Sequence, residues 1–203
     1  MLKELLKNKK FSKIIEEYLK KSEIMDIILF GSIIRGKENP KDIDLLVIYS
    51  QSTKDIIEMN HTLKKQLEDT IQNIEITGKK YNEIFNQEFL ARESILSEGF
   101  SMRQRKFLSE CFGYKNFVLF RYSLKNLNKS KRMTFYYSLY GRGKEKGILE
   151  KNKSYKFSST IILASVENSE VIKSFLEKWK INYTEFPIII PETIIKYSLS
   201  KEK

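Results

Sequence analysis

The sequence predicts an α/β (α+β) protein: a small mixed sheet with helices on one face, followed by a small, basic α+β domain. Over residues 1 to about 103, short apolar runs rich in β-branched residues alternate with segments whose apolar residues recur at helical spacing. Strands and helices that alternate in this way form such a sheet. The excess of basic residues begins only after this segment. We therefore predict two domains, residues 1–103 and residues 104–203.

The first domain is predicted to alternate helices with strands. Apolar positions between Leu2 and Tyr18 recur at helical spacing and indicate an N-terminal helix that breaks near Asn8. Ser52 or Thr53 is expected to cap a later helix that reaches about residue 70, and Gly99 is a candidate C-cap. The other predicted elements are strands at 24–30, 43–49 and 73–77, a turn or short helix at 31–37, and helical patches at 81–88 and 91–98.

The second domain has a different pattern. Residues 128–140 are expected to form a basic, aromatic helix that Gly141 ends. Pro187 is expected to break the last strand, because proline cannot donate to a sheet. The predicted elements are strands at 116–122, 158–166 and 181–190, helices at 128–140 and 168–179, and a flexible loop rich in glycine and lysine at 141–147.

Composition excludes several kinds of site. The chain has one cysteine, Cys111, and one histidine, His61, so an intramolecular disulfide and a zinc site of several Cys and His ligands are excluded. Cys111 is expected to be buried as a small hydrophobic side chain, and His61 to be exposed. The apolar runs are far shorter than a membrane span, and the first residues lack the apolar stretch of a signal peptide. We therefore expect a cytoplasmic protein with no membrane partner.

The positive charge is concentrated in the second half of the chain. Residues 1–103 hold 17 Lys/Arg and 17 Asp/Glu, whereas residues 104–203 hold 20 and 9. The whole net charge of +11 therefore belongs to the second domain. Like charges repel one another, so such a concentration favours an anionic partner for this domain.

The most informative motif lies between residues 28 and 48. Gly31 and Ser32 end one apolar run, and Asp42 and Asp44 stand at the start of the next. Residues at i and i+2 of a strand share a face, so the two carboxylates are expected side by side next to a Gly-Ser turn that opens a helix. Mg²⁺ prefers carboxylate and phosphate oxygens, and a helix N-terminus favours anions. The motif therefore predicts a site for a divalent metal and a nucleoside triphosphate.

The motif resembles the signature of the DNA polymerase beta-like nucleotidyltransferase superfamily, in its minimal nucleotidyltransferase branch. The matching residues are Gly31-Ser32, Arg35-Gly36 and Asp42-Ile-Asp-Leu-Leu-Val47, with Ser32 and Asp42 ten positions apart as in the family pattern. The resemblance implies the nucleotidyltransferase fold for residues 1–103. It also implies an enzyme that transfers a nucleoside monophosphate from a nucleoside triphosphate, with ATP as the default donor.

The resemblance also assigns roles to individual residues. It implies a site for two Mg²⁺ ions held by Asp42, Asp44 and a third acidic residue on a neighbouring strand, a position that Glu75 occupies here. The family more often has aspartate there, and the alternative for Glu75 is a solvated side chain on an edge strand. Gly31 would let the backbone approach the triphosphate, and Ser32 would donate a hydrogen bond to a phosphate oxygen. Arg35 would pair with phosphates or brace the acidic cluster, or form a surface salt bridge.

The basic helix and loop of the second domain are the predicted nucleic-acid contacts, because lysine and arginine neutralise backbone phosphates. Tyr136, Tyr137 and Tyr140 would serve as stacking platforms or, with Met133, as a core stripe, which is the preferred interpretation. The predicted phosphate contacts are Lys129, Lys131, Arg132, Arg142, Lys144 and Lys146.

Three functions fit these observations. The first is transfer of a nucleotide to a nucleic acid, with RNA, such as a tRNA 3′ end, preferred over DNA because of the basic second domain. The second is transfer of AMP to a protein, because minimal nucleotidyltransferases often act as antitoxins on a HEPN-type ribonuclease partner. The third is a catalytically silent nucleic-acid-binding module, which the presence of Asp42 and Asp44 argues against.

Overall fold

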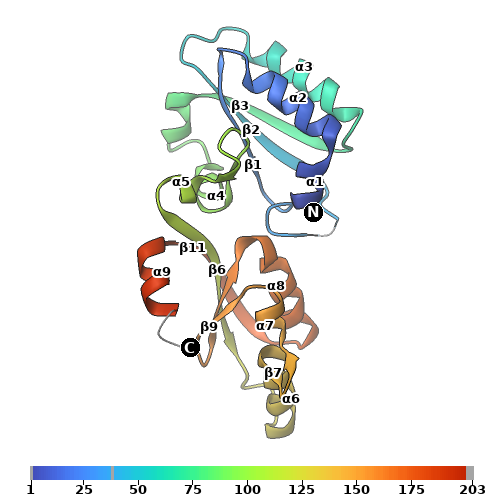
Figure 1. Cartoon of the computed structure of the whole chain (residues 1–203), viewed down its shortest axis with the longest axis vertical. Coiled ribbons are helices and arrows are strands. Elements are labelled where there is room, and N and C mark those ends of the chain that lie inside the picture. The colour runs from blue at the N-terminus through green and yellow to red at the C-terminus, as the bar shows by residue number, and fades with distance from the viewer. Residues whose placement is uncertain (1, 38, 200–203) are drawn as a thin grey trace. The chain divides into compact units, whose positions relative to one another are not determined.

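The computed structural model describes residues 2–37 and 39–199, and the chain folds as two compact units, Met1–Gly113 and Tyr114–Lys203 (Figure 1). The sequence places the domain boundary at 103/104, ten residues earlier. The intervening residues include β5 (Lys106–Phe107), which pairs with β4 (Phe100–Ser101), and the short helix α5 (Leu108–Cys111). None of the described helices is long and apolar enough to cross a membrane.

The first unit is built on a five-stranded mixed sheet in the order β3-β2-β1-β4-β5. The central strands β1 (Ile24–Phe30) and β2 (Ile43–Tyr49) have the predicted bounds and pair antiparallel, and β3 (Ile74–Lys80) pairs parallel to β2. The main chains of Ile27, Ile28 and Leu29 are thus in the middle of the sheet, and their side chains are fully buried. The predicted α/β class with a small mixed sheet is confirmed.

The N-terminal helices form as the apolar spacing predicts. Helix α1 (Leu2–Lys7) and helix α2 (Lys9–Leu19) are separated at Asn8, whose side chain accepts hydrogen bonds from the N–H groups of Lys10 and Phe11. The break therefore arises because Asn8 caps the second helix. Helix α3 (Ile56–Glu68) begins later than expected.

The late start of α3 corrects the predicted cap. The Thr53 hydroxyl lies 3.0 Å from that of Ser50, and it donates to the carbonyl of Glu23. It is thus used to fix the loop after β2, and Asp55 precedes the helix without a side-chain cap.

Both faces of the first sheet are covered in part. Tyr49 of β2 donates a 2.8 Å hydrogen bond to Asn60, which places α3 on one face. The opposite face carries a cluster of buried residues, namely Ile28, Leu46, Phe89 and Ile95. Two short helices follow β3 and lead to this cluster: the 3₁₀ helix η1 (Tyr81–Phe85) and α4 (Arg92–Glu98). The face that bears α4 also bears Asp44, because Asp44 and Leu46 are two positions apart on β2.

The second unit has the order β-α-β-β-α-β of a split β-α-β, or ferredoxin-like, arrangement. Its antiparallel sheet has the order β11-β6-β10-β9, and helices α6 and α8 connect strands that are not neighbours. The elements are β6 (Tyr114–Ser123), α6 (Lys129–Tyr140), β7 (Gly141–Arg142), β8 (Glu145–Lys146), α7 (Ile148–Lys151), β9 (Tyr155–Ser158), β10 (Ile161–Ser165), η2 (Val166–Asn168), α8 (Ser169–Lys178), β11 (Asn182–Pro191) and α9 (Glu192–Leu199).

Two predictions about the second unit's backbone are wrong. Pro187 does not break the last strand: β11 is continuous, and Pro187 pairs with Val118 of β6. Proline is tolerated there because β11 is an edge strand, where an outward N–H has no partner to lose. The loop at 141–147 is not irregular either, since β7 and β8 pair in it as a short hairpin. Gly141 ends α6 as predicted, with a φ of 97° that favours glycine.

The buried face of α6 also differs from the prediction. Phe135 and Leu139 are fully buried, whereas Met133 and Tyr137 of the expected core stripe are 46% and 40% exposed. The helix is apolar on more than one side, so periodicity alone did not identify the face that packs on the sheet. Cys111 was expected to be buried but is exposed, because the helix that carries it is a single turn at the end of the first unit.

Candidate metal and nucleotide site

Three carboxylates converge at one edge of the first sheet. Asp42 directly precedes β2 and Asp44 lies within it, while Glu75 lies on β3 in direct register with Asp44. One carboxylate oxygen from each lies within 4.8 Å of the others. Glu75 is exposed on an edge strand, which agrees with the alternative that it is a solvated side chain. Its carboxylate nevertheless belongs to the cluster. We call Asp42, Asp44 and Glu75 the acidic triad.

The segment after β1 forms a tight turn against the triad, and we call residues 31–36 the Gly31 turn. It is closed by hydrogen bonds from Ile34 N to Gly31 O and from Gly36 N to Ile33 O. Of the two alternatives expected for residues 31–37, the turn forms and the short helix does not, so Ser32 has no helix N-terminus behind it. Instead, residues 32–36 form successive turns that lead to residue 37.

Gly31 is required by the geometry of this turn. Its φ is 81°, which side chains rarely adopt, and a Cβ atom placed on it would collide with the carboxylate of Asp44. The close approach therefore brings the backbone of the turn directly onto the triad. Ser32 follows at the surface of this turn, half-buried.

Arg35 connects the turn to the rest of the unit. Its Nη1 donates to both carboxylate oxygens of Glu98, at 2.9 and 3.1 Å. The Arg35 side chain is 37% exposed and that of Glu98 only 9%. This contact is a salt bridge, the third of the roles considered for Arg35, although its partner, Glu98 of α4, is buried and lies outside the triad.

The charges of the site shift the pKa of two carboxyl groups. Burial raises the pKa of Asp44, and the negative charges of Asp42 and Glu75 raise it further, while Arg35 lowers it. Burial also raises the pKa of Glu98, against the opposing effect of the Arg35 charge and hydrogen bond and of the Gly31 N–H. The metal-free triad is thus a cluster of negative charges that lacks a full counter-charge.

The donor set of the triad fits a hard divalent cation. Three carboxylates supply only oxygen ligands, as Mg²⁺ prefers, and leave coordination positions for water and phosphate oxygens. A bound cation would also relieve the repulsion that raises the pKa of Asp44. The residues present are therefore suited to metal binding.

The structure places the six basic residues predicted to contact nucleic acid in two groups. All six are exposed. Lys129, Lys131 and Lys144 form the first group. The other three have partners within the unit: the Arg132 Nε donates to the carbonyls of Leu124 and Leu127, Arg142 lies over the Tyr137 ring, 4.8 Å from its centroid, and Lys146 forms a 2.6 Å ion pair with Glu150. Arg132 thus holds the loop before α6.

The aromatic side chains near these residues are arranged as pairs. The rings of Tyr136 and Tyr140 are stacked, with 5.8 Å between centroids and 15° between planes. The Lys156 Nζ lies 5.3 Å from the centroid of Tyr140. Both tyrosines are half-buried, so they belong neither wholly to the core nor wholly to the surface.

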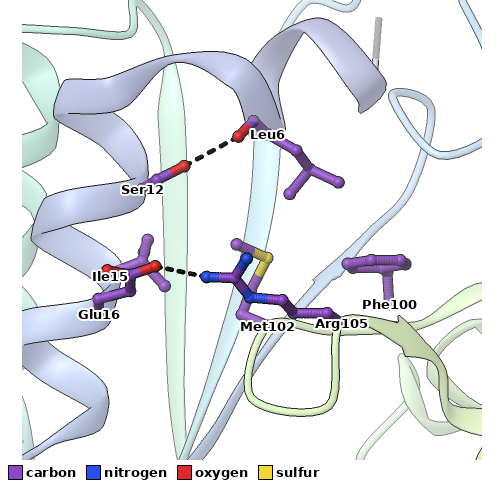
Figure 2. A pocket seen from close by; sticks show the side chains of 7 residues that line it. All are labelled: Leu6, Ser12, Ile15, Glu16, Phe100, Met102 and Arg105. Carbon is purple, nitrogen blue, oxygen red and sulfur yellow. Dashed lines mark hydrogen bonds and ion pairs between the residues drawn. The ribbon is translucent and has the colours of Figure 1, made fainter.

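A separate hollow of about 120 Å³ lies between α1–α2 and β4 (Figure 2). Its lining is mostly apolar, and Figure 2 shows Arg105 reaching across to Glu16 at its side. Ser12 uses its hydroxyl internally, by donating to the carbonyl of Leu6. No residue of the acidic triad or of the Gly31 turn lines this hollow, so it is separate from the candidate site.

Sequence reasoning did not identify Glu98 as a partner of the site. One signal was available: Glu98 lies three positions after Ile95 in a predicted helix. The two side chains therefore share a helix face, and the apolar Ile95 indicates that this face is buried. Its partner is 63 positions away in the sequence, and nothing local indicates that distance.

One comparison with known proteins bears on the first unit. Residues 12–99 match the family described as "Polymerase beta, Nucleotidyltransferase". No curated protein and no solved structure matches the chain. The matched segment contains the Gly31 turn, the whole acidic triad and Glu98, and it indicates nucleotidyl transfer, a transferase activity on a nucleotide substrate. Residues 12–99 are therefore a DNA polymerase beta-like nucleotidyltransferase segment.

Proposed function

We propose that this protein is a Mg²⁺-dependent enzyme that transfers a nucleoside monophosphate from a nucleoside triphosphate, with ATP as the default donor, to RNA. The observation that carries the transfer reaction is the convergence of three carboxylates beside a glycine turn within a nucleotidyltransferase segment. The second unit, with 18 Lys/Arg and 8 Asp/Glu, supports a nucleic acid as the acceptor.

The residues of the triad and the turn divide the work of the reaction. Asp42, Asp44 and Glu75 would hold the metal, which neutralises charge on the entering and leaving oxygens of the α-phosphate when two ions are bound. Glu75 is also the candidate base for the acceptor hydroxyl, because it is the exposed member of the triad. The Gly31 backbone allows phosphates to approach, Ser32 donates to a phosphate oxygen, and the charge of Arg35 stabilises the triphosphate.

The second unit would bind the acceptor through its exposed lysines. Lys129 and Lys131 begin α6, and Lys144 lies in the β7–β8 hairpin, so these three are the proposed phosphate contacts. Arg142 and Lys146 already have partners in the free protein and would have to exchange them for phosphates. The stacked Tyr136 and Tyr140 present a half-buried aromatic edge for a base.

The test is incubation of the purified protein with Mg²⁺ and each of the four α-³²P-labelled nucleoside triphosphates. Bulk tRNA and lysate protein are supplied as acceptors in separate reactions. We expect label in RNA, and we expect it to be lost in the Asp42→Asn/Asp44→Asn double variant. Label in a protein band, as an AMP-transferring antitoxin with a HEPN-type partner would give, would contradict the proposed acceptor but support the reaction. Nucleotide-independent RNA binding without transfer would contradict the reaction.

A further inference from the structure

Glu98 is the one buried charged side chain in the described part of the chain, with 7% of its surface exposed. It ends α4 on the face of the sheet that bears the acidic triad. The next residue, Gly99, fixes this helix end, because a Cβ atom there would collide with Ile95 O and crowd the Ile28 side chain. Burying a carboxylate is costly unless it is well paired. The contacts that Glu98 makes therefore indicate its role.

The carboxylate of Glu98 holds the Gly31 turn through Arg35. It accepts from Arg35 Nη1 at 2.9 and 3.1 Å, and the N–H of Gly31, at the start of the turn, lowers its pKa. The fifth residue of the turn is thus fixed on a group that is itself held by the core. Glu98 in this way connects α4 with the segment that approaches Asp44.

These contacts also determine where the positive charge of Arg35 lies. The Arg35 charge acts on Glu98 and on Asp44, since it lowers the pKa of both. Without the Glu98 carboxylate, the guanidinium would be drawn toward the negative triad, where the metal and the phosphates would bind. Glu98 therefore keeps the Arg35 guanidinium near the triad but paired with Glu98 itself, outside the triad.

We propose that Glu98 is a positioning residue that holds the Gly31 turn and the Arg35 guanidinium in the arrangement that meets the triphosphate of the donor. This inference rests on the proposed function, because it assigns the turn to donor binding. It makes Glu98 a determinant of nucleotide affinity that does not itself touch nucleotide or metal.

The test measures binding of the α,β-methylene analogue of ATP with Mg²⁺ by calorimetry in four proteins: wild type, Glu98→Gln, Arg35→Ala and the double variant. We expect Glu98→Gln to raise Kd at least tenfold in the wild-type background and threefold or less in the Arg35→Ala background, because the effect acts through Arg35. Glu93→Gln, an exposed change on the same helix, is the matched control and should leave Kd within twofold. Mn²⁺ binding without nucleotide should also stay within threefold in Glu98→Gln.

A second measurement needs no nucleotide. Amide hydrogen exchange at Ile34 and Gly36, whose N–H groups close the Gly31 turn, should be at least tenfold faster in Glu98→Gln than in wild type, because the ion pair that holds Arg35 and the turn is lost. If Glu98→Gln does not fold, Glu98→Asp keeps the charge but withdraws the carboxylate, and it should still raise Kd threefold or more.

Each outcome bears on one of the two proposals. An unchanged Kd in folded Glu98→Gln or Glu98→Asp, an equal effect in both Arg35 backgrounds, or unchanged exchange at Ile34 and Gly36 would overturn the positioning role. Failure of the wild-type protein to bind the analogue would instead overturn the proposed donor binding, and with it the role assigned to Glu98. A lower melting temperature with normal Kd would make Glu98 a purely structural residue and would also refute the inference.

Discussion

Replacing Asp44 by asparagine should stabilise the metal-free protein while abolishing its stabilisation by Mg²⁺. The side chain keeps its shape, so the close contact with the Gly31 turn is preserved. What changes is the charge: burial, Asp42 and Glu75 all raise the pKa of Asp44, and only Arg35 lowers it. A carboxyl group whose pKa is raised on folding is destabilising when ionised, so removing the charge should raise the free energy of unfolding.

The size of the effect follows from the geometry of the triad. Two unit charges at the 4.8 Å limit of this cluster repel by about 0.9 kcal/mol in water and by about 3.5 kcal/mol at an effective dielectric of 20. The site is partly exposed, so the lower figure applies to each of the two neighbours of Asp44. The attraction of Arg35 offsets roughly one of them, which leaves about 1 kcal/mol from the charges alone for Asp44→Asn. Burial, the largest cause of the raised pKa, acts in the same direction. For a unit of about this size we therefore expect a gain of at least roughly 4 °C in melting temperature.

The assay is thermal unfolding of wild type and Asp44→Asn with EDTA and with Mg²⁺, across pH. The pKa of Asp44 is near 3.8 when unfolded and higher when folded. Its ionisation therefore costs stability as the pH rises from the unfolded to the folded pKa. The advantage of Asp44→Asn should be absent below pH 3.8, grow through this window and stay constant above it. Mg²⁺ should raise the melting temperature of wild type only, because binding to the folded state requires the charged triad.

Two results would refute this reasoning. If Asp44→Asn is less stable than wild type in EDTA near neutral pH, the carboxylate is held by favourable contacts, and repulsion does not dominate. If Mg²⁺ stabilises both proteins equally, the cation binds elsewhere. Ser50→Ala, which lies just after β2 and outside the triad, serves as a control that should respond to Mg²⁺ like wild type.

Three further predictions test the turn, the second unit and a structural arginine. Gly31→Ala should cost at least 1–2 kcal/mol, because its φ of 81° is strained for alanine and its Cβ meets Asp44; chemical denaturation measures this, with Gly113→Ala, strained but uncrowded, as the control. Changing Lys129, Lys131 and Lys144 together to alanine should weaken tRNA binding and reduce the slope of log K against log salt by about 2–3, whereas Lys3→Ala in the first unit should not. Arg103→Ala should destabilise more than Arg92→Ala, because Arg103 donates to the carbonyls of Leu19, Ile24 and Met25 and Arg92 to that of Asn86; equal melting temperatures would contradict this.

The elements that sequence reasoning located best are those with strong local signals. Strands β1 and β2 have the predicted bounds because each is a mostly apolar run, with one aspartate, whose residues are largely buried. Asn8, Asn128 and Gly141 mark helix ends because a cap needs only its neighbours. The prediction that Ser52 or Thr53 caps a helix is wrong because Thr53 hydrogen-bonds with Glu23 and Ser50 instead. The fold of the sheet brings Glu23 to Thr53, and the local sequence does not indicate this contact.

The errors in the second unit have the same origin. Whether Pro187 interrupts a strand depends on whether that strand is at an edge, which is a property of the sheet order and not of the segment. Likewise, α6 carries aromatic residues on several sides, and the sheet selects Phe135 and Leu139 for burial. In both cases the sequence limits the choices, and tertiary contacts decide among them.

The candidate site shows how far a local motif can determine a functional arrangement. Asp42, Asp44 and Gly31 are brought together by two adjacent strands and the turn after β1, so their convergence follows from spacing alone. Glu75 joins them because β3 runs parallel to β2 and pairs in register with it, which requires a crossover helix, α3, between the two strands. Glu98 arrives from α4, which follows β3 by way of η1, and its partner Arg35 is 63 positions away in the sequence. The ligand set is therefore encoded by neighbouring elements, whereas the partner of Arg35 is encoded by the fold of the whole unit.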